Sequence, residues 1–308
     1  MKLVLQLSRQ DPALARAEAE SLFPKAKALH SELLLVDGDP KLLSRLVLTR
    51  FAGKLLAEAG DCGSLKLPAY KSFAVRVSRV AGKEGTRGIV DAVASRVKGK
   101  VDLKAPTAVI RVFTDGKKYW AAEELYEYSQ KAFAARDVNA RLVFNPTSLQ
   151  PKWGRLLVNL TGATKGKVLD PFCGVGGILL EAVDMGLRAQ GVEISEGYAE
   201  GARENAWFYR MEKKVKVDNA DFLEWKGGEF DAVVTDLPYG KSSGLFGKKI
   251  DELYLAAFRK MKKHSKKLVV MAHSDLRPLL KKAGWKTDAK FDMYVHRSMR
   301  RHIHVATC

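Results

Sequence analysis

The sequence predicts an α/β protein in which a parallel sheet, covered by helices on both faces, follows a half of mixed α+β structure. In the second half, short apolar strands alternate with helical stretches, which is typical of such a sheet. In the first half, strands and helices are mixed, and a stretch of it is strongly basic. With 308 residues, the chain is long enough for two or more domains.

The first half is predicted to form small α+β units. Its apolar patterns indicate strands at 2–7, 33–36 and 73–80, helices at 12–23, 40–56 and 89–97, and a hairpin of strands 108–113 and 118–123. In the third strand, apolar residues alternate with Arg76 and Ser78, and Arg79 follows. This pattern predicts a half-buried strand with a partly cationic outer face.

The pattern breaks between residues 136 and 151, where Asn145-Pro146-Thr147-Ser148 and Pro151 predict a linker. A helix at 153–161 follows. We then expect strands at 167–170, 189–194, 215–217, 230–236 and 267–272, and helices at 176–185, 197–209, 250–262 and 275–282. The tail at 290–305 alternates again and predicts a final antiparallel hairpin.

Charge gives the first indication of function. The formal net charge is +18, and it is clustered: residues 66–118 hold 13 Lys/Arg against 4 Asp/Glu, and residues 256–302 hold 14 against 3. Such clusters favour a nucleic-acid partner over a generic solvated surface. No apolar stretch approaches the length of a membrane span. Three widely spaced cysteines indicate neither a disulfide framework nor a zinc site, and a cytoplasmic location is expected.

The stretch Val168 to Ala182 reads as a strand, a glycine-rich turn and a helix. Gly174 and Gly176 allow a ligand to approach the backbone closely, and the helix start offers free N–H groups. The nicotinamide fingerprint needs a third glycine where this chain has Leu179, so the match to it is poor. Asp170 ends the strand and suits a ligand with an ammonium group better than a pyrophosphate.

Two further carboxylates follow at strand ends. Glu193 ends the next strand, where a carboxylate accepts hydrogen bonds from both ribose hydroxyls. Asp221 follows the third strand and is placed to accept from an adenine amino group. Ammonium, ribose and adenine together indicate S-adenosylmethionine as the ligand. The alternative is that these are ordinary carboxylates at the crevices of a sheet.

These residues carry a family resemblance. The segments DPFCGVGG (170–177) and TDLPYG (235–240) resemble the amino-methyltransferases with an acidic-Pro-Pro-aromatic motif, and most of all the archaeal tRNA (guanine-10) N2-methyltransferases. Residues 145–162 and 295–303 are also similar to that family. The resemblance implies a Rossmann-like, seven-stranded methyltransferase domain, S-adenosylmethionine as methyl donor and tRNA as substrate. It further implies a ferredoxin-like domain (1–60), a THUMP RNA-binding domain (61–138), a linker (139–152) and the methyltransferase domain (153–308).

The segment Thr235 to Gly240 is the expected acceptor site. A purine amine is a weak nucleophile because its lone pair is delocalised into the ring. The Asp236 carboxylate and the backbone carbonyl of Leu237 are expected to accept its two N–H bonds and so localise that pair. Tyr239 is expected to stack on the extruded base, with Pro238 holding the turn. Leu237 departs from the family's usual proline, and it is expected to keep the acceptor carbonyl but to lose some rigidity of the turn.

Other residues have roles that the resemblance or the charge pattern implies. Phe172 and Ser148 are expected to contact the methyl donor. Phosphate contacts are expected from Lys71, Arg76, Arg79, Arg297, Arg300 and Arg301, for which a solvated surface is the alternative. The chemistry requires no metal.

The Asp236-to-Tyr239 motif does not identify the target nucleotide, because it can bind any exocyclic amine. The alternatives to position 10 are another tRNA guanine, an rRNA guanine or the N6 amine of an adenine. A different class, a non-catalytic RNA-binding module, is disfavoured by the intact acidic residues Asp170, Glu193 and Asp221. The number of methyl groups added, the oligomeric state and any accessory subunit also stay open.

Overall fold

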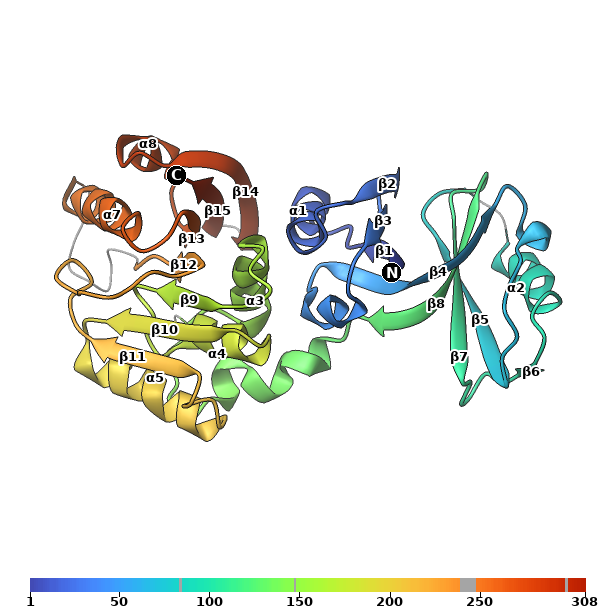
Figure 1. The fold of residues 1–308 in the computed structure, drawn as a ribbon, viewed down its shortest axis with the longest axis horizontal. Coiled ribbons are helices and arrows are strands. Elements are labelled where there is room, and N and C mark those ends of the chain that lie inside the picture. The colour runs from blue at the N-terminus through green and yellow to red at the C-terminus, as the bar shows by residue number, and fades with distance from the viewer. Residues whose placement is uncertain (83–84, 147, 239–247, 297–298) are drawn as a thin grey trace. The chain divides into compact units, whose positions relative to one another are not determined.

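The structure, a computed structural model, divides the chain into two compact units, Met1–Ser129 and Gln130–Cys308 (Figure 1). The residues that it describes are 1–82, 85–146, 148–238, 248–296 and 299–308. The predicted division of the first unit near residue 60, and the linker at 139–152, stay predictions.

The first unit is built on one eight-stranded sheet with the order β2-β3-β1-β4-β8-β7-β5-β6. Its elements are β1 (Lys2–Leu7), α1 (Pro12–Leu22), β2 (Lys27–His30), β3 (Leu33–Asp37), η1 (Pro40–Arg45), β4 (Thr49–Ala59), η2 (Cys62–Ser64), β5 (Ser72–Arg79), α2 (Thr86–Ala94), β6 (Lys100–Val101), β7 (Ala108–Thr114) and β8 (Tyr119–Glu127). The predicted hairpin around residues 114–117 is confirmed, because β7 and β8 pair antiparallel. β4 pairs with β1 and with β8, so strands on both sides of residue 60 share this sheet.

The predicted helix at 40–56 is wrong. Only a short 3₁₀ turn, η1, forms there, and the chain then continues as the long strand β4. Between them, the N–H groups of Val47 and Leu48 donate to the buried carboxylate of Glu18, at 2.9 and 2.8 Å. Because a side chain from α1 takes these donors, they cannot bond to carbonyls four residues earlier, and the helix cannot continue.

The cationic face predicted for the strand at 73–80 is only partly confirmed. Arg76 and Arg79 are exposed on β5. Ser78, which was expected to share the outer face, is buried and accepts a hydrogen bond from Arg111 Nη1 at 3.0 Å. The strand is therefore covered on part of the face that the alternation assigned to solvent.

The second unit contains a seven-stranded sheet with the order β11-β10-β9-β12-β13-β15-β14. Its elements are η3 (Gln130–Arg136), η4 (Val138–Ala140), α3 (Pro151–Leu160), β9 (Lys167–Asp170), α4 (Gly177–Asp184), β10 (Arg188–Glu193), α5 (Glu196–Phe208), β11 (Val215–Asn219), β12 (Ala232–Asp236), α7 (Lys248–Met261), β13 (Lys267–Ala272), α8 (Arg277–Lys282), β14 (Lys286–His296) and β15 (Met299–Thr307). The predicted strands, helices and final hairpin of this half are confirmed to within a few residues.

The strand order places a ligand-binding edge at the centre of this sheet. The chain runs outward from β9 through β10 to β11, and then returns to pair β12 with the other side of β9, all in parallel. In such doubly wound sheets, ligands bind outside the carboxyl ends of the strands at this switch point. Asp170 ends β9 and Asp236 ends β12, so both lie at that edge.

Apolar side chains anchor the strands that carry the site. α7 and α8 pack on one face of the sheet, in a buried core that includes Leu268, Val270 and Ala272 of β13. The alternate residues Val269 and Met271 are also fully buried, and β13 contacts α3. Because both faces of β13 are covered, its neighbour β12 is held rigidly at the centre of the sheet. No helix in the described part of the chain is long and apolar enough to cross a membrane.

Candidate functional site

A cavity of about 600 Å³ opens at the carboxyl ends of β9, β10 and β12. It brings together nine of the residues predicted for donor binding and catalysis, which are Ser148, Asp170, Phe172, Gly174, Glu193, Asp221, Asp236, Leu237 and Pro238. Gly176 is not part of the cavity wall. Tyr239 and Gly240 lie outside the described residues.

Asp170 is a buried carboxylate that lines the cavity, and its exposed fraction is 2%. Thr235 Oγ1 and the N–H of Phe172 both donate to its Oδ1, at 2.7 and 3.2 Å. Burial raises the pKa of Asp170 to about 7, nearby Asp236 and Glu193 add to the rise, and the two hydrogen bonds oppose it. No described residue donates to Oδ2, so a cationic ligand group fits there.

Glu193 holds the glycine-rich turn in shape. Its Oε2 accepts from the N–H of Gly174, and its Oε1 from the N–H of Ser195, both at 2.9 Å. Each oxygen keeps a second lone pair for a ligand hydroxyl. Gly174 and Gly176 have φ values of +52° and +86°, which favour glycine. Gly176 precedes α4, and its role is therefore in the turn rather than in contact with the cavity.

The wall beyond Glu193 is mainly apolar. Phe172 packs edge-on against Phe222, with ring centroids 5.9 Å apart. Asp221 is exposed, and its Oδ1 accepts from the N–H of Leu223 at 2.8 Å. Ile194 and Tyr198 also line the cavity, although both are largely exposed. These two residues were not among those predicted from the sequence. Ile194 directly follows Glu193, and Tyr198 lies in the first turn of α5, the helix that comes next.

The turn after β12 is fixed from two sides. Leu237 donates its N–H to the carbonyl of Met271 at 3.0 Å, and its side chain is 1% exposed within the core. The hydroxyl of Tyr254 in α7 donates to the carbonyl of Pro238 at 2.6 Å. Burial raises the pKa of Tyr254 to about 12, with nearby Asp236 adding to the rise, so this donor keeps its proton.

Leu237 was expected to keep the acceptor carbonyl at some cost in turn rigidity. The structure shows a compensating contact, because a proline here has no N–H to donate to Met271. Among the described residues, none donates a hydrogen bond to the carbonyl of Leu237. Within this part of the chain, the oxygen is open to a ligand.

Arg301 has a partner that the sequence did not indicate. Its Nη1 lies 3.0 Å from Oδ2 of Asp236, and the two side chains are 12% and 15% exposed. It was predicted to bind phosphate with its neighbours in the final hairpin. That contact stays a prediction, but the observed partner of Arg301 is the proposed catalytic carboxylate.

The remaining candidates for RNA contact that the structure describes are exposed. Lys71, Arg76 and Arg79 lie in the first unit, and Arg300 lies on β15. Arg76 is not an isolated cation, because its Nη1 lies 3.8 Å from carboxylate oxygens of both Glu124 and Glu127. Arg297 lies outside the described residues. RNA binding by these side chains stays a prediction.

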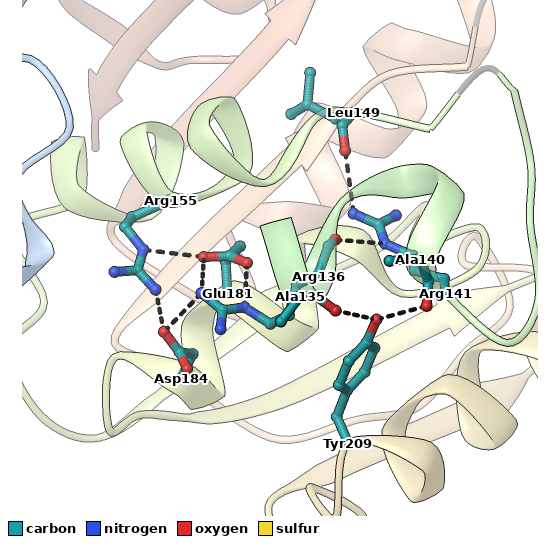
Figure 2. Close-up of polar contacts among 9 residues, drawn as sticks. All are labelled: Ala135, Arg136, Ala140, Arg141, Leu149, Arg155, Glu181, Asp184 and Tyr209. Carbon is teal, nitrogen blue, oxygen red and sulfur yellow. Dashed lines mark hydrogen bonds and ion pairs between the residues drawn. The ribbon is translucent and has the colours of Figure 1, made fainter. Parts of the chain in front are cut away.

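Ion pairs hold the segment before α3, and α3 itself, on α4, the helix that follows the glycine-rich turn (Figure 2). Buried Glu181 of α4 accepts from Arg136 Nε at 2.7 Å and from Arg155 Nε at 2.9 Å. Asp184, one turn later, pairs with the same two guanidinium groups. Two charge-assisted contacts per arginine fix η3 and α3 on this helix.

Arg141 extends this contact to the cavity. It is 6% exposed, and its Nη2 donates to the carbonyl of Leu149 at 3.3 Å (Figure 2). Asn205 of α5 binds the same segment, with its amide bonded to the N–H and the carbonyl of Val143. Leu149 and Ser148 line the cavity. The structure therefore holds residues before α3 as one wall of the site.

The doubly wound sheet, the acidic residues at successive strand ends and the glycine-rich turn define a Rossmann-like methyltransferase domain. The family model of the RMKL-like methyltransferase domain matches residues 139–302, which is more than half of the chain. The crystal structure of TrmN from Thermus thermophilus shares the fold with a TM-score of 0.53, at 20% identity, over 100% of this chain and 99% of that one.

Two relatives show which family of methyltransferases this chain resembles. tRNA (guanine(10)-N2)-dimethyltransferase of Pyrococcus abyssi (strain GE5 / Orsay) is 31% identical over 96% of each chain. The protein of the same name from Methanothermobacter thermautotrophicus is 33% identical over 76% of this chain and 73% of its own. The chain belongs to this family of tRNA (guanine(10)-N2)-dimethyltransferases, as its motifs predicted. The THUMP domain expected in the first unit stays a prediction.

Proposed function

We propose that this protein transfers a methyl group from S-adenosylmethionine to the exocyclic N2 amine of a guanosine in tRNA, at position 10. The observation that carries the proposal is the joining of two carboxylates, Asp170 and Asp236, at one cavity. Thr235 connects them, since its hydroxyl binds Asp170 and the next residue is Asp236. The names of the curated relatives support the choice of tRNA and of position 10.

The cavity suits this donor. Oδ2 of buried Asp170 would hold the ammonium group, Glu193 the ribose hydroxyls and Asp221 the adenine amine, between the apolar walls of Phe172 and Ile194. S-adenosylmethionine, when bound, supplies an electrophilic methyl group on its sulfonium centre. The carboxylate charge of the cavity favours a ligand that carries two positive groups.

Asp236 and Leu237 would orient the acceptor. The Asp236 carboxylate and the Leu237 carbonyl accept the two N–H bonds of the amine, so the nitrogen lone pair is localised and directed into the cavity. Asp236 then stabilises the positive nitrogen until its proton leaves. The rigid turn, fixed by Met271 and Tyr254, keeps both acceptors in place, and positioning of this kind supplies most of the rate. Tyr239 would stack on the extruded base and hold it in line with the methyl group.

The test is incubation with methyl-labelled S-adenosylmethionine and total tRNA, followed by nucleoside mass spectrometry and mapping of the labelled position. We expect label on guanine N2 at position 10, and the product mass distinguishes one methyl group from two. A tRNA with inosine at position 10 is the matched control, because inosine lacks the amine and should take no label. Labelled adenine, or label only at another guanine, would refute the proposed target.

A further inference from the structure

The ion pair between Arg301 and Asp236 lies at the edge of the cavity rather than on the open surface. The two atoms are 3.0 Å apart, and the Arg301 side chain is 12% exposed. An arginine that grips RNA phosphate needs an accessible guanidinium, as Arg300 next to it has. A mostly buried pair of this geometry instead restricts both side chains to one arrangement.

The register of the sheet explains how Arg301 reaches this carboxylate. β15 runs antiparallel to β13, with Ile303 opposite Met271. Arg301 precedes Ile303 by two residues, so it lies at the carboxyl end of β13, the same edge at which Asp236 ends β12. Its Nη1 also lies 3.5 Å from the sulfur of Met271, between the two strands. Arg300, the adjacent residue, points to the opposite face of the sheet.

The surroundings of Asp236 explain why a cation is needed there. Among the described residues, Asp236 raises the pKa of Asp170 on β9 and of Tyr254 on α7, so both groups lie within its electrostatic reach. Tyr254 keeps its proton and is neutral, whereas an ionised Asp170 makes a negative charge on Asp236 less favourable in this mostly buried site. Arg301 offsets this repulsion from the opposite side, on β15.

We propose that Arg301 is a positioning residue for methyl transfer, which fixes the rotation of the Asp236 carboxylate and keeps it ionised as a hydrogen-bond acceptor. This inference rests on the proposed function of Asp236. It also gives Asp236 a defined part in the reaction: a carboxylate paired with a guanidinium is a weak base, so it orients the amine rather than removing a proton before transfer.

The kinetic test compares Arg301→Gln and Arg301→Lys with Arg188→Gln. Arg188 is exposed at the amino end of β10, the opposite edge of the sheet, and its substitution removes the same charge. We expect Arg301→Gln to lower kcat about 100-fold, with the KM for tRNA and the donor affinity nearly unchanged. Arg301→Lys should recover part of the loss, and Arg188→Gln should match the wild type. A raised KM for tRNA with unchanged kcat would instead assign Arg301 to phosphate binding and overturn the proposal.

A second measurement does not use activity. Carbon-13 NMR follows the titration of the Asp236 carboxyl group, with its signal assigned from Asp236→Asn. We expect Arg301→Gln to raise the titration midpoint by about one pH unit or more. An unchanged midpoint would overturn the proposal. A wild-type protein that methylates no guanine would refute the proposed function and leave this result standing. If Arg301→Gln fails to fold, Arg301→Met, which also removes the charge, serves for the same titration.

Discussion

At the carboxyl edge of the sheet, one residue is proposed to bind the methyl donor and another the acceptor amine. Asp170 is buried and its pKa is raised to about 7, so a cationic ligand group would stabilise its ionised form. Asp236 is held by Arg301 and sits one residue after Thr235, which binds Asp170. A change at one carboxylate should therefore affect one half of the reaction, and the other half only through Thr235.

Substitution of Asp236 tests the acceptor half. We expect Asp236→Ala to leave the affinities for tRNA and S-adenosylmethionine nearly unchanged, because neither depends mainly on this side chain, while kcat falls at least about 100-fold. Filter binding, calorimetry and single-turnover assays measure the three quantities. Retained turnover in this variant would rule out the proposed mechanism.

The pH dependence of donor binding tests Asp170. An ammonium group binds the ionised carboxylate, so the protein must lose a proton wherever Asp170 is protonated in the free state. Because its folded pKa is about 7, donor affinity should fall as the pH drops from about 7 to 5.5, approaching tenfold per unit. The donor's own amino group stays protonated over this range.

Calorimetry in two buffers of different ionisation enthalpy measures this linkage as proton release. Asp170→Asn should bind the donor more weakly and lose the pH dependence. A wild-type affinity that is flat between these pH values would show that Asp170 does not hold the ammonium group.

At the scale of elements, the donor wall depends on how the segment before α3 is attached. η3 and α3 are fixed to α4 by the carboxylates of Glu181 and Asp184, and Arg141 then fixes the carbonyl of Leu149 (Figure 2). The helix that follows the glycine-rich turn therefore also supports Ser148. Loosening α4 from this segment should weaken both stability and donor binding.

Glu181→Gln tests that attachment. The change leaves the mostly buried guanidinium groups of Arg136 and Arg155 with a neutral partner, and we expect unfolding in urea to show a loss of about 3 kcal/mol. The affinity for S-adenosylmethionine should fall with it. Glu200→Gln is the matched control, because Glu200 is exposed in a surface pair and should cost less than about 1 kcal/mol. Equal effects of the two substitutions would contradict the structural role of Glu181.

At the scale of the whole molecule, positive charge is shared between the two units. One basic stretch, at 66–118, belongs to the first unit, and the other, at 256–302, to the second. Binding of a polyanion through both releases more counterions than binding through one. Both units should therefore contribute to tRNA affinity, whereas the donor cavity lies within the second unit alone.

A fragment of residues 130–308 tests this division. We expect it to keep the donor affinity of the full chain but to bind tRNA more weakly. The dependence of log affinity on log salt should also be shallower, by about 0.7 to 0.9 for each phosphate that the fragment no longer neutralises. Titrations at several salt concentrations measure both slopes. A fragment that binds tRNA as tightly as the full chain would show that the first unit is not part of the RNA interface.

The sequence alone determined the features that depend on local pattern. Alternating apolar strands and helices identified the parallel sheet, and Asp170, Glu193 and Asp236 were recognised because each ends a strand or begins a turn. Parallel strands bring their carboxyl ends to one edge, so these residues could be expected to meet. The prediction of a helix at 40–56 was wrong because Glu18, which is distant in sequence, accepts hydrogen bonds from two backbone N–H groups there.

Only the tertiary structure decided the contacts between residues far apart in the chain. Arg301 looked like a surface cation in a basic hairpin, and antiparallel pairing of β15 with β13 is what brings it to Asp236. The N–H of Leu237 can fix the turn, as a proline would, only because β13 brings the carbonyl of Met271 within hydrogen-bond distance. Local pattern specifies which residues end a strand, whereas the register between strands specifies which partner each of those residues meets.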